Sequence, residues 1–474
     1  MDQVSSILTY ISDHIVTLLS NHVIYLRGKD EKELDLKMNK KNFFSFFIIA
    51  MGKMGSFELN YSSDIDIILF FNFNYTNIKD HFETKQFIIN KFKKLVKILT
   101  NFSEGDFLYR VDLRLRPDPS STPIAIDTKF AEIYYQKLGR TWERMAFIKA
   151  RPVCGDIKKG KEFLNKLDSF IWRNHFDYAA IDEVKNLREK MKLNSPYLKL
   201  YDLSGYNIKT GLGGIRDIEL FTQTYQLIVA GRNRELRGAK TVKTLNKLKE
   251  LGWLDHEPFE KLVRAYNFFR AIENRLQIVN NTQNQNIPDE SSLQFNQLAT
   301  LAGFASCSKF KDLVLQNLKN VKLITDDFFS NFKFRNVQKK NFLDTEIIKS
   351  NEGKLGFKLS NENLFYSKIS QLKQLSIFKN ESALRSFNAL IPKISNEIIQ
   401  FNDQNFVIDK FEVFLKKLSS GSQIFPLLEN NPSSIKILLI VLNSSSLISD
   451  QLSNDVKLFD LFISKNFMDS ISSK

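Results

Sequence analysis

The sequence predicts an α+β protein, with a small sheet domain near the N-terminus and helical bundles after it. Two apolar runs, 46–51 and 64–71, have the length and composition of buried strands. A segment with helical spacing, 79–101, separates the second run from a third candidate strand at 107–115. After about residue 127 we find almost no strand pattern, and three- and four-residue apolar spacing dominates.

Each element of the sheet domain has its own signal. Ile7, Ile11 and Ile15 lie at four-residue steps, which indicates an amphipathic N-terminal helix. The run 46–51 ends at Gly52, and 64–71 alternates before it becomes wholly apolar, as expected of a strand that enters a core. The elements expected in order are a helix at 3–27, a strand at 46–51, a short helix at 55–60, a strand at 64–71, a helix at 79–101 and a strand at 107–115.

The rest of the chain is expected to form helices on either side of a linker rich in Lys and Asn, at 333–352. The helices expected are 130–138, 142–150, 215–230, 240–251, 257–279, 381–399 and 406–418. The domains expected are a helical segment at 1–41, the sheet domain at 42–190, a helical bundle at 191–332, a linker at 333–353 and a C-terminal helical region at 354–474.

The composition indicates a folded protein of several domains. The 474 residues are 43% hydrophobic and 26% charged, close to ordinary globular values. Lys and Arg total 68 against 53 Asp and Glu, a net charge of +15. Such a charge attracts phosphates, nucleic acid and acidic protein surfaces. The excess is spread along the chain and accompanies abundant Asn, Ile and Phe, as an AT-rich genome produces, so charge alone selects no partner.

Cysteine, histidine and the N-terminus exclude several classes of protein. Cys154 and Cys307 form no CxxC pair, so we expect neither a disulfide framework nor a thiolate metal site. The five histidines lack HExxH or HxH spacing, so none is expected to be a metal ligand. Asp2 and Asp13 interrupt the first apolar residues, which is unlike a signal peptide. We therefore expect a cytoplasmic protein with no membrane partner.

Two aspartates at the start of the second strand are the strongest chemical signal. Asp64 and Asp66 are two residues apart, so on a strand their carboxylates point to the same face. Close carboxylates repel each other, and a divalent cation such as Mg²⁺ compensates for this charge. Asp112 offers a third carboxylate on a later strand, on one face with Arg110 and Arg114. Three carboxylates match the two-metal chemistry of nucleotidyl transfer, whereas a bare Asp-x-Asp pair more often only ends a strand in solvent.

A glycine and a serine lie upstream of these carboxylates. Gly55 and Ser56 follow the apolar strand and are expected to open a helix, where backbone N–H groups bind phosphate readily. The alternative for this pair is a simple helix start with Ser56 as the cap.

Four longer segments closely resemble the signature of the glutamine synthetase adenylyltransferases. They occur in the family's order and cover about residues 45–290. The segments are Gly52–Asp66 (GKMGSFELNYSSDID), Arg110–Pro117 (RVDLRLRP), Trp142–Arg144 (WER) with Lys149–Val153 (KARPV), and Gly213–Glu219 (GGIRDIE).

This resemblance implies a sheet domain similar to that of DNA polymerase β, in which an aspartate triad holds two Mg²⁺ ions. Full-length members of the family have two homologous halves joined by a helical region. One half adds AMP from ATP to a glutamine synthetase tyrosine, and the other removes it by phosphorolysis, releasing ADP. The Ser-Ser-Asp-Ile-Asp signature occurs once here, so the chain resembles one half.

Further residues indicate which half the chain resembles. The Ser62-Ser63 form of the signature and residues 118–123 (DPSSTP) are similar to the N-terminal, deadenylylating half. Residues 410–415 and 425–432 are similar to the helical region that follows it. The partners implied are adenylylated glutamine synthetase, a PII-type nitrogen-signalling protein, ATP or ADP, and phosphate.

Site roles follow from the motifs together with the resemblance. Asp64, Asp66 and Asp112 are predicted to be catalytic and to bind the metal ions. Arg216 and Glu219 on the helix at 215–230 are candidates for a partner or supporting role, although such a polar stripe is ordinarily solvated. Glu273 and Gln277 are expected to be structural. The residues predicted to bind nucleotide or phosphate are Gly55, Ser56, Lys53, Ser63, Arg114, Lys149 and Arg151.

Several of these residues have an alternative role. Lys53 could equally be an exposed lysine. Lys149 and Arg151 could instead interact with the C-terminus of the preceding helix.

Three other functions remain open from the sequence. The first is forward, ATP-dependent adenylylation of the same tyrosine, which needs the same aspartates. The second is a regulatory half without turnover of its own, for which a missing triad carboxylate would be the sign, yet all three are present. The third is a nucleic-acid polymerase, which would need a basic groove with interleaved aromatic residues that the sequence does not show. We expect no nucleic-acid partner.

Overall fold

The computed structural model describes residues 2–25, 44–73, 81–101, 107–173, 178–193, 203–280, 283–338, 368, 381–401, 403–418, 424–425, 428 and 432–454. The chain divides into two compact units. Unit 1 consists of Met1–Trp172 and Leu187–Phe328, and unit 2 of Arg173–Asn186 and Phe329–Lys474. Among the helices described, none has both the length and the apolarity needed to cross a bilayer.

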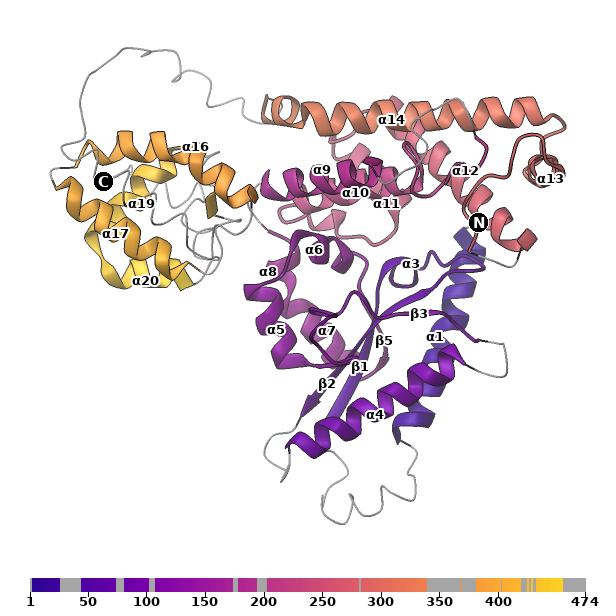
Figure 1. The fold of residues 1–474 in the computed structure, drawn as a ribbon, viewed down its shortest axis with the longest axis horizontal. Helices are drawn as coiled ribbons and strands as arrows, with labels where there is room; N and C mark the ends of the chain where they lie inside the picture. Colours follow the sequence, from indigo (N-terminus) through magenta and orange to yellow (C-terminus); the bar gives the residue numbers. More distant parts are fainter. Residues whose placement is uncertain are drawn as a thin grey trace. The chain divides into compact units, whose positions relative to one another are not determined.

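Unit 1 contains a five-stranded mixed sheet (Figure 1). The central strand β2 pairs in antiparallel fashion with β1, over the whole length of β1. On its other edge β2 pairs in parallel with β3 near its start and with β4 near its end. β5 pairs antiparallel with the far edge of β1. The strands are β1 (Phe44–Ala50), β2 (Ile65–Phe73), β3 (Val111–Asp112), β4 (Ala125–Asp127) and β5 (Arg151–Gly155).

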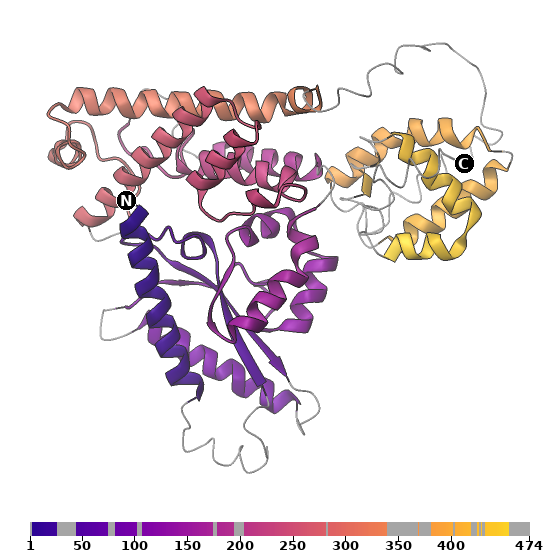
Figure 2. The ribbon, with the colours of Figure 1, turned by 180° about the vertical axis from the view of Figure 1, so that it is seen from behind.

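Helices cover both faces of this sheet, which explains why β1 and β2 are almost continuously apolar. The helices α1 (Asp2–Tyr25) and α4 (His81–Thr100) cover one face, and their core includes Ile67 and Leu69 of β2 (Figures 1 and 2). On the opposite face Phe47 and Phe70 pack against Phe163 of α7, with ring centroids 5.7 and 4.7 Å away. Because residues alternate along β2, Asp66 belongs to this second face.

The remaining helices of the sheet region are α3 (Gly52–Gly55), α5 (Thr128–Lys137), α6 (Thr141–Phe147), α7 (Ile157–Lys166) and α8 (Asp168–Ile171). The helical region of unit 1 contains α10 (Ile215–Val229), a 3₁₀ turn η2 (Arg234–Leu236), α11 (Thr241–Glu250), α12 (His256–Asn280) and α13 (Leu293–Leu301). Two more helices, α9 (Tyr178–Leu193) and α14 (Cys307–Gln338), contribute residues to both units.

Unit 2 has its own hydrophobic core. It is built from α16 (Glu381–Ile398), α17 (Gln404–Lys417), α19 (Pro432–Ser444) and α20 (Ser446–Asn454). Fully buried side chains such as Leu390, Phe414 and Leu439 come from three of these helices and pack in one cluster.

The predicted α+β class is confirmed, because a small mixed sheet lies in a largely helical chain. Several element predictions are confirmed to within a few residues, among them β1, β2, α4, α10, α12, α16 and α17. The two units do not test the expected domain boundaries. Most of the predicted linker, 339–353, lies outside the described residues. Its predicted start at residue 333 is wrong, because α14 continues to Gln338.

The predicted short helix at 55–60 is wrong. The helix there is α3, which ends at Gly55 instead of starting near it. Phe57 then adopts a φ of 59°, in the left-handed region, and this ends the helical path.

The predicted strands were also partly wrong. The strand expected at 107–115 is only Val111–Asp112, because the Asp112 carboxylate accepts a hydrogen bond of 2.8 Å from the Arg114 N–H and closes a turn. β5 was missed, because Pro152 and Gly155 interrupt a strand pattern of five residues.

Candidate active site

A cavity of about 480 Å³ lies within unit 1, between the sheet region and the helices that follow it in the chain. Gly52, Asp66 and Asp112 line it from the sheet region, and Glu219 and Gln223 line it from α10. Four acidic side chains (Asp64, Asp66, Asp112, Glu219) and five basic ones (Lys53, Arg114, Lys149, Lys209, Arg216) line this cavity. This mixture of charges suits a ligand that carries phosphate groups together with cations.

Strand pairing brings two of the predicted carboxylates together. Asp66 on β2 and Asp112 on β3 are partners in the parallel register, so their side chains emerge side by side on neighbouring strands. Asp64 lies two residues before Asp66 and lines the same cavity. The three aspartates, predicted from two motifs, therefore lie at one edge of the sheet and line one cavity.

Gly52 makes room for the Asp66 carboxylate. Its φ is +52°, and a Cβ placed there would lie 2.4 Å from Asp66 Oδ2. A hydrogen bond of 2.8 Å from the Met51 N–H to the Asp66 carbonyl holds the two segments together. Only glycine combines this backbone angle with such a close approach.

Two of the three aspartates are held by arginines. Asp64 Oδ1 accepts hydrogen bonds from Arg110 Nε at 2.9 Å and from Gln283 Nε2 at 2.6 Å. Asp112 accepts from Arg114 through its backbone N–H and through its guanidinium, with the closest contact at 2.6 Å. Burial alone would raise the pKa of Asp112, but these hydrogen bonds from Arg114 lower it below its ordinary value.

Asp66 differs from the other two aspartates. Its side chain has no hydrogen-bond or ion-pair partner in the described part of the chain. Burial, followed by the charges of Asp112 and Asp64, raises the pKa of Asp66 to about 6. Like charges therefore surround this largely buried carboxylate, and no described cation is in contact with it.

The chemistry of this donor set fits a divalent cation. Mg²⁺ takes oxygen ligands, and the uncompensated Asp66 beside Asp112 supplies them. Within the described ranges, no group of three or more His, Cys, Asp or Glu side chains is arranged to hold a metal ion. Two of the three aspartates are instead bonded to arginines, Asp64 to Arg110 and Asp112 to Arg114. The Arg114 side chain is 85% exposed, so it can release Asp112 at little cost.

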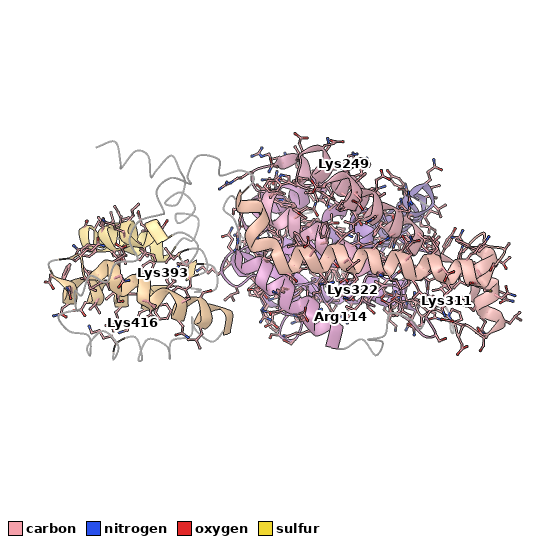
Figure 3. All side chains as sticks on the ribbon, turned by 90° about the horizontal axis from the view of Figure 1, so that it is seen from above. Arg114, Lys249, Lys311, Lys322, Lys393 and Lys416 are labelled. Atoms are coloured by element: carbon pink, nitrogen blue, oxygen red, sulfur yellow. The ribbon has the colours of Figure 1, made fainter. Side chains whose placement is uncertain are left out.

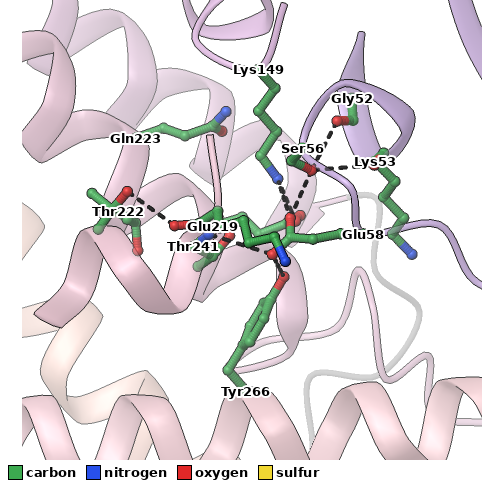
Figure 4. A network of polar contacts seen from close by, with 12 residues as sticks. Gly52, Lys53, Ser56, Glu58, Lys149, Glu219, Thr222, Gln223, Thr241 and Tyr266 are labelled. Carbon is green, nitrogen blue, oxygen red and sulfur yellow. Dashed lines mark hydrogen bonds and ion pairs between the residues drawn. The ribbon is translucent and has the colours of Figure 1, made fainter. Parts of the chain in front are cut away.

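A buried polar network backs the cavity (Figure 4). Lys149 Nζ contacts Glu219 Oε1 at 3.0 Å and Glu58 Oε2 at 3.4 Å, and Ser56 donates to Glu58 at 2.8 Å. Burial would lower the pKa of Lys149, but Glu219 and Glu58 raise it. Burial would also raise the pKa of Glu219, yet Lys149, Lys53 and Arg216 lower it to about 2. Lys149 and Glu219 are therefore both charged and hold each other in place.

A second ion pair joins α3 to α12. Lys53 Nζ lies 2.9 Å from Glu273 Oε1, and Arg270 also contacts this carboxylate, at 3.1 Å. Despite burial, Lys53 and Arg270 lower the pKa of Glu273. In addition, the Ser62 N–H donates to Gln277 Oε1 at 3.1 Å. The expectation of a structural role for Glu273 and Gln277 fits these contacts, and Gln277 also lines the cavity.

Nine of the twelve predicted site residues line the cavity, and the described residues Gly55, Ser56 and Arg151 do not. The Gly55 N–H is bonded to the Met51 carbonyl and the Ser56 N–H to the Gly52 carbonyl, so neither is free to cradle phosphate. A Cβ on Gly55 would lie 1.8 Å from the Lys149 carbonyl oxygen, so this glycine allows close packing.

Arg151 is a structural residue. Its guanidinium donates to the Asp13 carboxylate at 2.8 Å and to the Gly55 carbonyl at 3.2 Å, and it covers the Phe57 ring. It therefore ties α1 to the segment that follows α3.

Sequence reasoning missed Lys209, Gln223 and Gln283 as cavity residues. Gln223 continues the polar stripe of α10 that contains Arg216 and Glu219, so helical spacing could have found it. Lys209 and Gln283 lie in segments without periodicity, and only the fold brings them to the carboxylates.

Comparison with known proteins gives two family matches. Residues 1–166 match the family described as Glutamate-ammonia ligase adenylyltransferase. Residues 185–329 match the family described as GlnD PII-uridylyltransferase.

Individual relatives match over nearly the whole chain. The bifunctional glutamine synthetase adenylyltransferase/adenylyl-removing enzyme of Bradyrhizobium sp. (strain BTAi1) is 32% identical over 90% of this chain and 44% of the relative. That of Bartonella quintana is 31% identical over 95% of this chain and 46% of the relative, and that of Rhizobium meliloti 32% over 87% and 42%. The chain thus spans about half the length of the curated relatives it matches.

These relatives are adenylyltransferases, which supports a nucleotidyltransferase class for the chain. More narrowly, the chain belongs to the family of glutamine synthetase adenylyltransferases and adenylyl-removing enzymes, and it corresponds to about half of such a protein.

Proposed function

We propose that this chain removes AMP from an adenylylated tyrosine of glutamine synthetase by phosphorolysis, with ADP as product. One observation carries the proposal: a carboxylate without a partner, Asp66, and two cations without a carboxylate partner, Lys209 and Arg216, line one cavity in the described structure. A phosphate group bound to a divalent cation would compensate both kinds of charge. The direction of the reaction is supported by the Ser62-Ser63 form of the signature.

The proposed cofactor is Mg²⁺, with two ions held by Asp64, Asp66 and Asp112 in a sheet domain of the nucleotidyltransferase kind. Bound there, the ions would neutralise charge on the phosphoryl oxygens. Lys149, held by Glu219, would keep a fixed positive charge beside the reacting group. The apolar side chains of Trp142, Met145 and Leu220 line the same cavity and would accept the adenine ring.

The reaction balances without a further reactant. An oxygen of inorganic phosphate attacks the α-phosphorus, and the bond from this phosphorus to the tyrosine oxygen breaks. The proton of hydrogen phosphate moves to the tyrosine oxygen, which leaves as the phenol. The attacking phosphate becomes the β-phosphate of ADP. Strong base catalysis is not needed, because the nucleophile is already an anion.

The partners we propose are adenylylated glutamine synthetase and a PII-type signalling protein. The match of residues 185–329 to a family named for PII uridylylation supports the second. The expectation of a cytoplasmic location stays a prediction.

The test is to incubate the full chain with adenylylated glutamine synthetase, phosphate and Mg²⁺, and to measure ADP. We expect ADP in proportion to the tyrosine released, and its loss in the Asp112→Asn variant. Asp312→Asn, an exposed carboxylate on α14, is the matched control and should stay active. If the chain instead labels the unmodified synthetase from ATP, the reverse reaction replaces the proposal. If neither reaction occurs, the regulatory interpretation replaces it.

A further inference from the structure

Two cations in the cavity wall, Lys209 and Arg216, have no ion-pair or hydrogen-bond partner for their side chains in the described structure. Both belong to the helical region of unit 1, outside the sheet region that supplies the aspartates. Neither takes part in the buried network behind the cavity.

The other three cations of the cavity are all paired. Lys53 contacts Glu273 at 2.9 Å, Lys149 contacts Glu219 at 3.0 Å, and Arg114 contacts Asp112 at 2.6 Å. Elsewhere in unit 1, Lys311 and Lys322 on α14 are labelled in Figure 3, and they pair with Glu290 and Asp326. Lys209 and Arg216 therefore stand out as charges that the protein leaves available at the cavity.

Their backbones are fixed to each other. The Arg216 N–H donates to the Lys209 carbonyl at 2.9 Å, so the loop and the first turn of α10 are joined at these two residues. The Asn207 side chain accepts from the Lys209 N–H at 3.1 Å, and the Ile208 N–H donates to the Gln285 carbonyl at 2.9 Å. The two backbones are therefore already ordered relative to each other, so a common ligand has only the two side chains to order.

Both cations also lie near other charged side chains of the cavity. Lys209 lines the same cavity as Asp66, Asp112 and Asp64. Arg216 helps to lower the pKa of Glu219, which is paired with Lys149. A phosphate on Lys209 and Arg216 would therefore lie near the carboxylates that are proposed to hold metal.

We propose that Lys209 and Arg216 form the subsite for the attacking inorganic phosphate, which becomes the β-phosphate of ADP. This rests on the proposed function for its role in turnover, but the binding of phosphate itself does not depend on it. Lys and Arg together give a point charge and a planar fork, which suit a tetrahedral oxyanion. The helical region would then complete an active site whose metal ligands come from the sheet.

The first test compares ADP with AMP, which lacks the β-phosphate. Affinities of the full chain are measured by calorimetry in one Mg²⁺ buffer. We expect the wild type to bind ADP more tightly than AMP, and Lys209→Met or Arg216→Met to weaken ADP binding roughly tenfold or more. AMP binding should stay unchanged in both variants, which also shows that they fold. Lys243→Met and Arg264→Met, exposed cations on α11 and α12, are the matched controls.

The second test is the dependence of deadenylylation on inorganic phosphate. The KM for phosphate should rise at least about tenfold in Lys209→Met, with a smaller change in kcat, and Lys209→Arg should restore much of it. If the wild type shows no deadenylylation, the proposed function fails, and the comparison of ADP with AMP still decides on the subsite.

Two results would overturn the subsite. One is an unchanged preference for ADP over AMP in both Met variants. The other is an active enzyme whose KM for phosphate matches that of the Lys243→Met control. Should a Met variant lose AMP binding as well, Lys209→Gln and Arg216→Gln are measured in its place, and the same two results decide.

Discussion

At the scale of single residues, the candidate site depends on Asp66 and on the glycine that faces it. Asp66 is the one triad carboxylate without a partner among the described residues, while Asp64 and Asp112 accept hydrogen bonds from arginines. A buried carboxylate of this kind lowers the stability of the folded protein when it is charged, and a bound cation would remove this penalty. Activity and stability should therefore respond in opposite directions when the Asp66 charge is removed.

Asp66→Asn is expected to lower kcat by roughly a hundredfold or more, because a charge that stabilises the reacting phosphate complex is lost. Without metal, the same change should raise the free energy of unfolding by roughly 1–2 kcal/mol. The folded-state pKa of Asp66, about 6, lies above its unfolded value, so the penalty is fully present above that pH. Denaturant unfolding of wild type and variant, in a chelator at pH 7.5, measures this difference in the free energy of unfolding. A less stable, fully active variant would contradict both expectations.

Gly52→Ala tests the space above this carboxylate. The added methyl group would meet Asp66 Oδ2 at 2.4 Å, at a backbone φ of +52° that alanine rarely adopts. We expect at least about a tenfold loss of kcat and a cost of roughly 1–2 kcal/mol in stability. Gly238→Ala is the control, because its Cβ would meet nothing closer than 3.7 Å. Equal activities of the two variants would show that the active site does not depend on Gly52.

At the scale of elements, α10 and α12 attach the helical region to the sheet region by buried charges. Lys149 from the sheet region meets Glu219 of α10, and Lys53 of α3 meets Glu273 of α12. Buried pairs of this kind add little net stability, but the loss of one partner leaves an expensive unpaired charge. These contacts position the cavity wall, and their effect on folding should depend on pH.

Glu219→Gln is expected to reduce the free energy of unfolding by roughly 3 kcal/mol at pH 7. The folded-state pKa of Glu219, about 2, lies below the unfolded value. Its contribution is therefore present above the unfolded pKa and is lost as the pH falls toward 2. Unfolding of wild type and variant, measured from pH 7 to pH 2.5, should show the gap closing. Glu257→Gln, which breaks an exposed pair with Lys261, should show no gap at any pH.

At the scale of the whole molecule, the chain contains two units with separate cores. The cavity belongs to unit 1, and a ligand that binds only the folded state stabilises the unit to which it binds. Two thermal transitions are expected, and only one of them should respond to nucleotide.

Calorimetry with ADP and Mg²⁺ tests this. At a ligand concentration of about 100 times Kd the stabilisation is roughly 2.7 kcal/mol, so the transition of unit 1 should shift upward by several degrees. Leu439→Ala in the core of unit 2 should reduce the free energy of unfolding of unit 2 by roughly 2–5 kcal/mol and so lower the temperature of the other transition. The shift caused by ADP should stay unchanged. A single transition that moves with both changes would show that the units unfold together.

The sequence alone determined the α+β class, several of the long helices and the three aspartates of the cavity. Apolar periodicity predicts α10 and α12, because a helix that buries one face repeats its apolar residues every three or four positions. The two-residue spacing predicts that Asp64 and Asp66 share a face, because side chains alternate along a strand. These features depend on neighbours in the chain.

Only the tertiary structure decided what surrounds those aspartates. The parallel register that places Asp112 beside Asp66 joins segments more than 40 residues apart, and no local pattern encodes it. Lys209 reaches the cavity because the helical region folds back over the sheet region, held by pairs such as Lys53 with Glu273. The sequence motif indicated Gly55 for phosphate, but the Gly55 N–H is bonded to the Met51 carbonyl, and it is Gly52 that faces the Asp66 carboxylate. Contacts between distant segments settle which charges stay free, because each charge takes the nearest partner that the fold supplies.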